Sequence, residues 1–328
     1  MNISNFMLKS CRKAYRTLAH PYFIKPDCEY DRTIANQQIY ELLYSDKPCM
    51  ISRLGSTETS IILNYMSIAD ESSFLKKIIK YVTTDTGLPV WDEMCFKYCE
   101  RYSGIFPAKK ELLSRFSERY LSDMQKMDLI GSFQYGEKYL PLPKSLIYVH
   151  LECLYPFFVD NPWTKALEGK RVLIVHPFEN TIRKQYANRK LLFENKDILP
   201  EFDLKIVRAV QTLGGEDKRF ADWFEALCYM EKEIERIDFD ICLLGCGAYG
   251  LPLAAFIKRL GKKAIHIGGG LQLMFGIKGK RWDNNAYHWK GLPQLETNYS
   301  QLYNKYWVRA NENETPKTAG KVENACYW

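Results

Sequence analysis

The sequence of 328 residues is 46% hydrophobic and 26% charged, which is typical of a globular protein with one large or two modest domains. No apolar run reaches about 18 residues, which excludes a membrane-spanning helix of ordinary length. The net charge of +7 is spread along the chain, which favours an anionic substrate or a membrane surface over nucleic acid. Ten scattered cysteines without a Cys-x-x-Cys pair, and no secretory signal, predict free thiols in the cytoplasm.

Residues 1–40 are predicted to form a helical segment ahead of the main domain. Within 1–20, apolar residues and cations are interspersed as in an amphipathic helix. The apolar members are Ile3, Phe6, Met7 and Leu18, and the cations are Lys9, Arg12, Lys13 and Arg16. Such a helix either packs on the domain or lies on an anionic membrane surface, so peripheral membrane contact is one expectation.

The first strand is predicted at 48–53, followed by a turn and a helix over 59–66. From 74 to 139 the apolar residues recur mostly at helical spacing, which predicts a helical insertion at about 70–145. A short strand is predicted near 146–149.

Strands and helices alternate regularly from residue 171 onward. Near-continuous apolar runs predict buried strands at 171–176, 204–210, 240–244 and 264–267. The pattern predicts an α/β fold: a Rossmann-like parallel sheet with helices on both faces and a helical insertion after the first βα unit. We expect this domain to span 41–290, with a tail at 291–328 that packs on its core. Ligands of such sheets bind beyond the carboxyl ends of the strands.

The most informative motif is Gly245-Cys-Gly-Ala-Tyr-Gly250, between a predicted strand and a predicted helix. Its glycines permit a tight turn, and the N–H groups at the helix start suit a phosphate. The Gly-x-Gly-x-x-Gly spacing also matches dinucleotide oxidoreductases. However, the turn lies late in the chain, and no acid follows the strand that ends at Ile267. A nucleotide diphosphate is therefore favoured, with a purely structural turn as the alternative.

Three further turns carry candidate side chains. Arg53 and Gly55 suit a diphosphate, and Glu58 suits a metal or a hydroxyl, unless this turn is only a helix cap. His176 suits a phosphate or acid–base chemistry, unless it is a buried loop residue. After His266, a glycine triplet and a basic loop predict an anion or sugar site, with a solvated loop as the alternative. The residues concerned are Gly268, Gly269, Gln272, Lys278, Lys280 and Arg281.

Two of these motifs resemble a known family. Arg53-Leu-Gly-Ser-Thr-Glu58 is similar to the Arg-Phe-Gly-Asp-Gly-Glu turn of the bacterial GT-D type glycosyltransferases. Gly247-Ala-Tyr-Gly-Leu-Pro-Leu-Ala-Ala and Lys263-Ala-Ile-His-Ile-Gly268 resemble that family's glycine turn, helix and Ala-Ile-Asp-Ile-Gly-His strand end. The resemblance covers about a quarter of the chain. It implies a modified Rossmann-like domain that binds a nucleotide sugar and builds a surface polysaccharide or glycoprotein glycan.

The family often holds a divalent metal at an Asp-x-Glu pair. Here Ser56 replaces the Asp, so Glu58 is the only carboxylate left for Mn²⁺ or Mg²⁺. The cations Arg53, Lys278, Lys280 and Arg281 are an alternative, metal-free way to neutralise a leaving diphosphate. Glu58 would then serve as general base toward the acceptor hydroxyl.

These observations predict a glycosyltransferase that moves a sugar from a nucleotide-diphosphate donor, with UDP-sugars favoured, to a glycan or lipid-linked acceptor. No nucleic-acid partner is expected. The residues assigned to catalysis are Glu58 and His266, and those assigned to the donor are Arg53, Gly55, His176, Gly245, Gly247, Tyr249, Gly250, Gly268, Gly269, Gln272, Lys278, Lys280 and Arg281. The alternatives are a non-catalytic nucleotide- or glycan-binding protein and a dinucleotide-dependent oxidoreductase.

Overall fold

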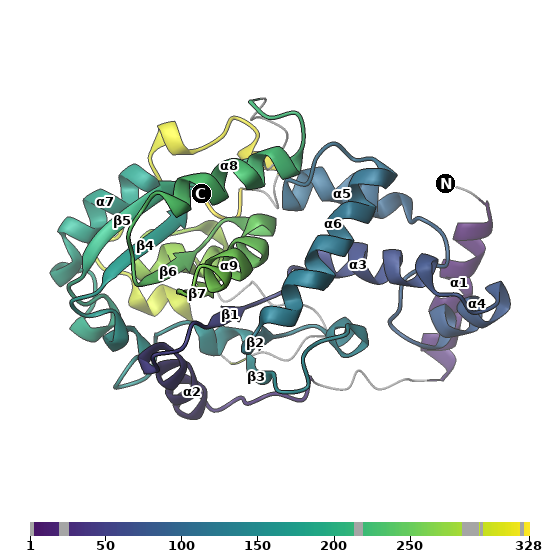
Figure 1. Ribbon diagram of the computed structural model, residues 1–328, viewed down its shortest axis with the longest axis horizontal. Coiled ribbons are helices and arrows are strands. Elements are labelled where there is room, and N and C mark those ends of the chain that lie inside the picture. Colours follow the sequence, from purple (N-terminus) through teal and green to yellow (C-terminus); the bar gives the residue numbers. More distant parts are fainter. Residues whose placement is uncertain (1–2, 20–25, 213–218, 284–294, 296–297, 322–324) are drawn as a thin grey trace.

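The computed structural model describes residues 3–19, 26–212, 219–283, 295, 298–321 and 325–328. Figure 1 shows a central sheet flanked by helices in one half of the molecule and a group of helices in the other half. Among the described residues, no helix is both long enough and apolar enough to span a membrane.

Seven parallel strands form one sheet in the order β3-β2-β1-β7-β6-β4-β5. The strands are β1 (Met50–Ser52), β2 (Leu129–Ser132), β3 (Ile147–His150), β4 (Arg171–His176), β5 (Asp203–Arg208), β6 (Ile241–Leu244) and β7 (Lys263–His266). In the register, Ile51 lies opposite both Leu129 and Ile265. The predicted Rossmann-like α/β fold is confirmed, and all seven strands end at the same edge of the sheet.

Alternate residues of the strands belong to two separate hydrophobic cores. In β4, Leu173 and Val175 belong to one core, whereas Val172 and Ile174 belong to the other. A strand buried on both faces needs apolar side chains at every position, which explains the continuous apolar runs in the sequence.

Helices cover both faces of the sheet. The first core includes residues of α3 (Ser56–Ala69), α6 (Lys110–Asp123), α8 (Trp223–Glu235) and α9 (Gly250–Arg259). The second core includes residues of α2 (Arg32–Tyr44), α7 (Glu179–Ala187) and α10 (Leu271–Met274). Burial against two helical layers holds the sheet rigid, so its carboxyl edge is a firm base for a site.

The helical insertion is shorter than predicted. It contains α4 (Phe74–Thr83), α5 (Glu93–Ser103) and α6, and then the chain returns to the sheet as β2. The prediction of several helices between 74 and 139 is therefore wrong at Leu129–Ser132, which is a strand. This strand has only four residues, all buried, and so short an apolar run has no period that separates a strand from a helix.

The two ends of the chain pack on different parts of the molecule. Helix α1 (Ile3–Leu18) lies against α4, far from the sheet (Figure 1). The tail returns to the second core through Tyr299, Trp307 and Trp328, each of which is buried. The segments 284–294 and 296–297 of the predicted domain end and tail lie outside the described residues.

Candidate functional site at the carboxyl edge of the sheet

A pocket lies at the carboxyl edge of the sheet, and we call it the edge pocket. Residues that follow β1, β4, β5, β6 and β7 line it, together with the end of α5 and the last two residues of the chain. The lining residues are Arg53, Tyr102, Ser103, His176, Pro177, Phe178, Ala209, Val210, Gln211, Thr212, Gly245, Cys246, Gly247, Tyr249, Gly268, Gly269, Gln272, Tyr327 and Trp328. The structure thus brings together residues from all four turns that carry candidate side chains in the sequence.

Arg53 follows β1 and carries the positive charge of the edge pocket. Its guanidinium lies 5.3 Å from the centre of the Phe133 ring, and its side chain runs beside Gly268. Within the described part of the chain, Arg53 forms no ion pair with a carboxylate and donates no side-chain hydrogen bond. A guanidinium has five N–H donors, so Arg53 retains its capacity to bind an anion.

His176 ends β4 and contributes a neutral imidazole to the edge pocket. Burial lowers the pKa of His176 to about 3, so the ring is uncharged near neutral pH. Its Nδ1 accepts a hydrogen bond from the backbone N–H of Phe178 at 3.1 Å. A neutral imidazole whose Nδ1 accepts must carry its proton on Nε2, so His176 is a hydrogen-bond donor through Nε2.

His266 ends β7 but does not line the edge pocket. Its Nδ1 lies 3.2 Å from the Ser52 hydroxyl oxygen, and its buried Nε2 has no hydrogen-bond partner among the described residues. Burial first, and then the charge of Arg53, lower the pKa of His266 to about 3. The His266 imidazole is therefore separated from any ligand in the edge pocket. The sequence-based assignment of His266 to catalysis does not fit this position.

Glu58 lies just behind the edge pocket, in the first turn of α3. It is only 6% exposed and its carboxylate folds over Gly55, where an added Cβ would lie 1.8 Å from Oε2. Burial raises the pKa of Glu58, while Arg53 and a hydrogen bond with Ser103 act in the opposite direction. Neither Glu58 nor Gly55 lines the pocket, but Ser103 does. Glu58 therefore lies behind the pocket wall, next to Ser103.

Packing accounts for the glycine turn between β6 and α9. A Cβ at Gly245 would lie 2.6 Å from the His176 ring, and one at Gly250 would lie 2.2 Å from the His266 ring. Gly247 has a φ of +57°, a conformation that favours glycine. Gly245 and Gly247 line the pocket, whereas Gly250 does not. In the dinucleotide-like spacing, Gly245 and Gly250 thus leave room for the imidazole rings of His176 and His266.

The glycine triplet after β7 also packs against side chains of the protein. A Cβ at Gly269 would lie 2.3 Å from the Tyr327 ring, and one at Gly270 would lie 2.1 Å from the Tyr155 ring. Gly268 has a φ of +73° and lies beside Arg53. The triplet therefore gives Arg53 and two tyrosine rings room to approach the backbone.

The predicted basic loop does not reach the edge pocket, so its assignment to the donor is corrected. Lys278 lies over the Tyr303 ring at 5.2 Å, and Lys280 is exposed. Arg281 donates a hydrogen bond to the Tyr327 hydroxyl at 3.1 Å. None of the three lines the pocket, and Arg281 instead holds a pocket residue in place.

Aromatic side chains form much of the remaining wall. Tyr249 stacks on Trp223 with ring centres 5.1 Å apart, and its hydroxyl lies 3.1 Å from that of Thr212. Gln272 donates to the backbone oxygen of Tyr327 at 3.0 Å, which anchors the tail against the pocket. Tyr327 and Trp328 lie in the tail that was predicted to pack on the core. No motif in the sequence marks Ser103 or Thr212 as pocket residues.

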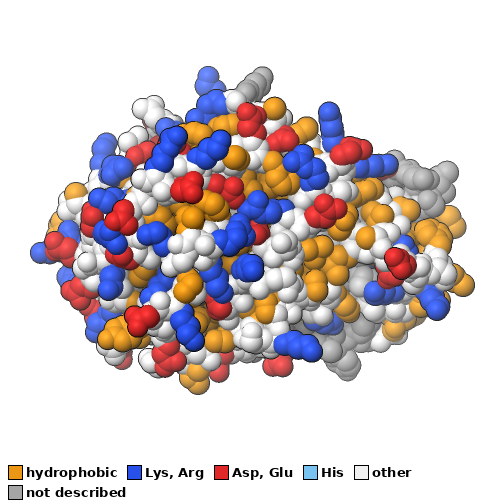
Figure 2. Space-filling model, viewed as in Figure 1, with side chains coloured by type: hydrophobic (Ala, Val, Ile, Leu, Met, Phe, Trp, Pro, Cys, Tyr) orange, Lys and Arg blue, Asp and Glu red, His pale blue; other side chains and the backbone are white. Residues whose placement is uncertain are grey.

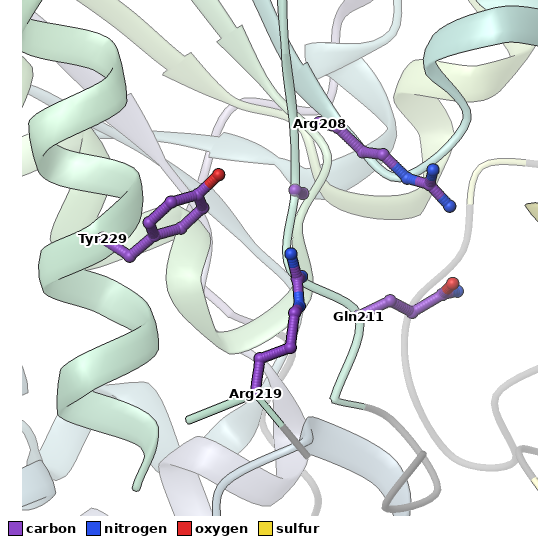
Figure 3. A pocket seen from close by; sticks show the side chains of 5 residues that line it. Arg208, Gln211, Arg219 and Tyr229 are labelled. Carbon is purple, nitrogen blue, oxygen red and sulfur yellow. The ribbon is translucent and has the colours of Figure 1, made fainter. Parts of the chain in front are cut away.

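A second, smaller group of polar side chains borders the edge pocket at the end of β5. This side pocket is lined by Arg208, Ala209, Gln211, Arg219 and Tyr229, and it shares Ala209 and Gln211 with the edge pocket. Figure 3 shows Tyr229 reaching from its helix toward the chain after β5, with Arg219 beside that chain. Two guanidinium groups thus flank one side of the edge pocket.

The residues present do not fit a Mn²⁺ or Mg²⁺ site at Glu58. Among the described residues, no group of three or more His, Cys, Asp or Glu side chains is placed to hold a metal ion. These cations take several oxygen ligands, whereas Glu58 is one buried carboxylate beside a positively charged Arg53. We derive no metal-dependent step.

Comparisons with known proteins identify no relative of the chain. No family model, no curated protein and no solved structure matches it. The resemblance of 53–58, 247–255 and 263–268 to GT-D type glycosyltransferases therefore remains a prediction, and the residues of the edge pocket are the basis for a proposed function.

Proposed function

We propose that the protein is a glycosyltransferase that transfers a sugar from a nucleotide-diphosphate donor to a glycan acceptor. The observation that carries this proposal is the Arg53 guanidinium, which lines a pocket at the carboxyl edge without a carboxylate partner among the described residues. A cation at this edge of a parallel sheet suits a diphosphate, and Tyr327 and Trp328 offer rings on which a base or sugar can stack.

In the proposed reaction, the acceptor oxygen attacks the anomeric carbon of the donor sugar. The bond between that carbon and the phosphate oxygen breaks, and its electron pair leaves with the nucleoside diphosphate. Arg53 stabilises the added negative charge, and the Nε2–H of His176 donates a hydrogen bond to the same group. Both groups are held by the protein before the donor binds, so little reorganisation is required.

The proton of the acceptor hydroxyl passes to Glu58 in this proposal. Glu58 does not line the pocket, so the Ser103 hydroxyl accepts the proton and gives its own to the carboxylate. Burial raises the pKa of Glu58, which makes its carboxylate a stronger base than an exposed one. Ser103 is thus a residue that touches the acceptor, and Glu58 acts through it.

Turnover of UDP- and GDP-sugars tests the proposal. The purified chain is incubated with each donor, with and without glycan acceptors, and release of the nucleoside diphosphate is measured. We expect release from one donor, and loss of at least about 90% of that activity in Glu58→Gln and Ser103→Ala at unchanged donor affinity. Absence of binding and turnover with every donor would contradict the proposal.

A non-catalytic nucleotide-binding protein is the second candidate. The burial of both Glu58 and His266 outside the edge pocket favours it, because neither group touches a ligand there. This candidate predicts that UDP or GDP raises the melting temperature without release of product. It also predicts that Glu58→Gln binds nucleotide as tightly as the wild type does.

A further inference from the structure

Helices α1 and α4 pack side by side at the end of the molecule farthest from the sheet, and we call them the helix pair (Figure 1). On α1, Met7 is 60% exposed and Leu18 is 81% exposed. With Cys11 and Ala14, which are also exposed, they form a stripe at spacings of four and three residues. Such spacing places all four side chains on one face, so α1 turns an apolar face toward solvent.

The opposite, basic face of α1 is attached to the rest of the protein. Lys9 forms an ion pair with Asp92 at 2.7 Å, and Arg16 pairs with Asp85. The Arg12 guanidinium lies 4.4 Å from the centre of the Tyr81 ring. This is the reverse of an ordinary surface helix, which buries its apolar face and exposes its charges. Ion pairs therefore fix the apolar stripe in an outward orientation.

Helix α4 also exposes apolar side chains. Phe74 is 57% exposed, Leu75 is 67% exposed and Ile79 is 54% exposed. Figure 2 shows hydrophobic side chains gathered at this end of the molecule, with cations among them. Exposed apolar side chains on two neighbouring helices are typical of a protein or membrane contact.

The charges around this surface decide between these partners. Lys13 on α1 and Lys76 on α4 are exposed, whereas Lys80, one turn after Lys76, pairs with Asp70 at 3.3 Å. In a symmetric dimer the same patch would face itself, which would bring these cations together. An anionic lipid surface instead complements them, and interfacial helices with apolar and basic residues bind such surfaces.

We propose that the helix pair is a membrane-docking surface that binds anionic phospholipid. The apolar side chains of α1 and α4 enter the headgroup region, while Lys13 and Lys76 contact lipid phosphates. This proposal does not rest on the proposed glycosyltransferase activity. It adds α4 to the N-terminal segment that the sequence pattern indicated, and it fixes which face of α1 contacts lipid.

A groove connects the helix pair with the edge pocket. Arg12 and Tyr81 line it on the side of the helix pair, and Ser56, Thr57 and Tyr102 line it on the other side. Tyr102 also lines the edge pocket.

Vesicle sedimentation of the full chain tests the proposal. The probes are phosphatidylcholine vesicles with and without phosphatidylglycerol. We expect the wild type to bind the anionic vesicles. A variant with Leu75→Ser and Ile79→Ser should bind them about tenfold or more weakly, because each substitution removes apolar area that the membrane would bury. The variant with Lys13→Glu and Lys76→Glu should lose the preference for anionic lipid.

Tyr44→Ser on α2 is the matched control, because Tyr44 is 75% exposed at a distance from the helix pair. It should bind as the wild type does, and all variants should unfold at the same temperature because their changed side chains are exposed. Failure of the wild type to bind either vesicle would overturn the proposal, as would equal binding by the Leu75 and Ile79 variant. A dimer in solution that the same substitutions dissociate would also overturn it.

Discussion

The edge pocket and the helix pair differ in the side chains that they present to a partner: polar groups line the edge pocket, whereas apolar groups cover the helix pair. At the edge pocket, His176, Ser103 and Gln272 are buried polar groups that line the pocket. At the helix pair, apolar residues such as Leu18 are exposed and the charges of α1 are used to attach the helix. The difference shows that an amphipathic pattern predicts a helix but not the direction in which its apolar face points.

The edge pocket depends most strongly on Arg53. Arg53→Ala should weaken UDP binding about 100-fold, because a charge-assisted contact to the diphosphate is lost. Isothermal titration calorimetry measures this, with unchanged thermal unfolding as evidence that the fold is intact. Arg236→Ala is the control, because the Arg236 side chain is 73% exposed and its partner among the described residues is Glu233 on the surface. Equal losses in both variants would indicate a general charge effect.

The glycine turn should resist substitution for reasons of packing. Gly250→Ala places a Cβ 2.2 Å from the His266 ring and should lower the free energy of unfolding by about 2 kcal/mol. Urea denaturation measures the change. Gly320→Ala, where an added Cβ meets nothing within 4 Å, should change stability by less than about 0.5 kcal/mol. A Gly250→Ala protein as stable as the wild type would show that the ring is free to move.

The buried imidazoles should make the edge pocket sensitive to acid. His176 has a pKa near 6.5 when unfolded and about 3 when folded, so the unfolded chain binds more protons between these values. Stability should therefore fall with decreasing pH below 6.5, by about 1.4 kcal/mol per pH unit from this group. His266 has the same lowered pKa and adds a similar loss.

The His176→Asn variant isolates the contribution of one ring, because Oδ1 of Asn can still accept the Phe178 N–H bond. Burial raises the pKa of Glu137 to about 7, which favours the folded state as pH falls and partly offsets the imidazoles. The comparison of variant and wild type cancels that offset. The variant should lose less stability on acidification, and parallel pH profiles would contradict the buried, neutral state of His176.

The side pocket should have the smallest effect. Arg208 is exposed at the end of β5, so Arg208→Ala should weaken UDP binding only about threefold and less in high salt. Titration at two salt concentrations measures this. A loss as large as that of Arg53→Ala would move the diphosphate from the edge pocket to the side pocket.

The sequence was sufficient for most of the fold because β4 and β6 are continuous apolar runs between helices. It also indicated that the turns at Arg53, His176 and Gly245 meet, since parallel strands end at one edge. It was not sufficient for β2, whose four buried residues carry no period. The sequence also does not predict the direction in which a long side chain points. Arg281 was therefore assigned to a ligand, although it donates a hydrogen bond to Tyr327.

Burial was the main source of error within the site. Glu58 follows a strand and His266 ends one, as ligand-binding residues do, yet Gly55 and Gly250 leave room for both side chains to fold inward. Ser103 and Tyr327 come from α5 and from the tail, and only tertiary packing brings them to the edge pocket.

A crystal structure of the chain with UDP tests the central claim most directly. The account predicts that the diphosphate contacts the Arg53 guanidinium and His176 Nε2, with the uracil ring against an aromatic residue of the edge pocket. A diphosphate bound at Lys278 and Lys280, or anywhere else away from Arg53, would contradict it.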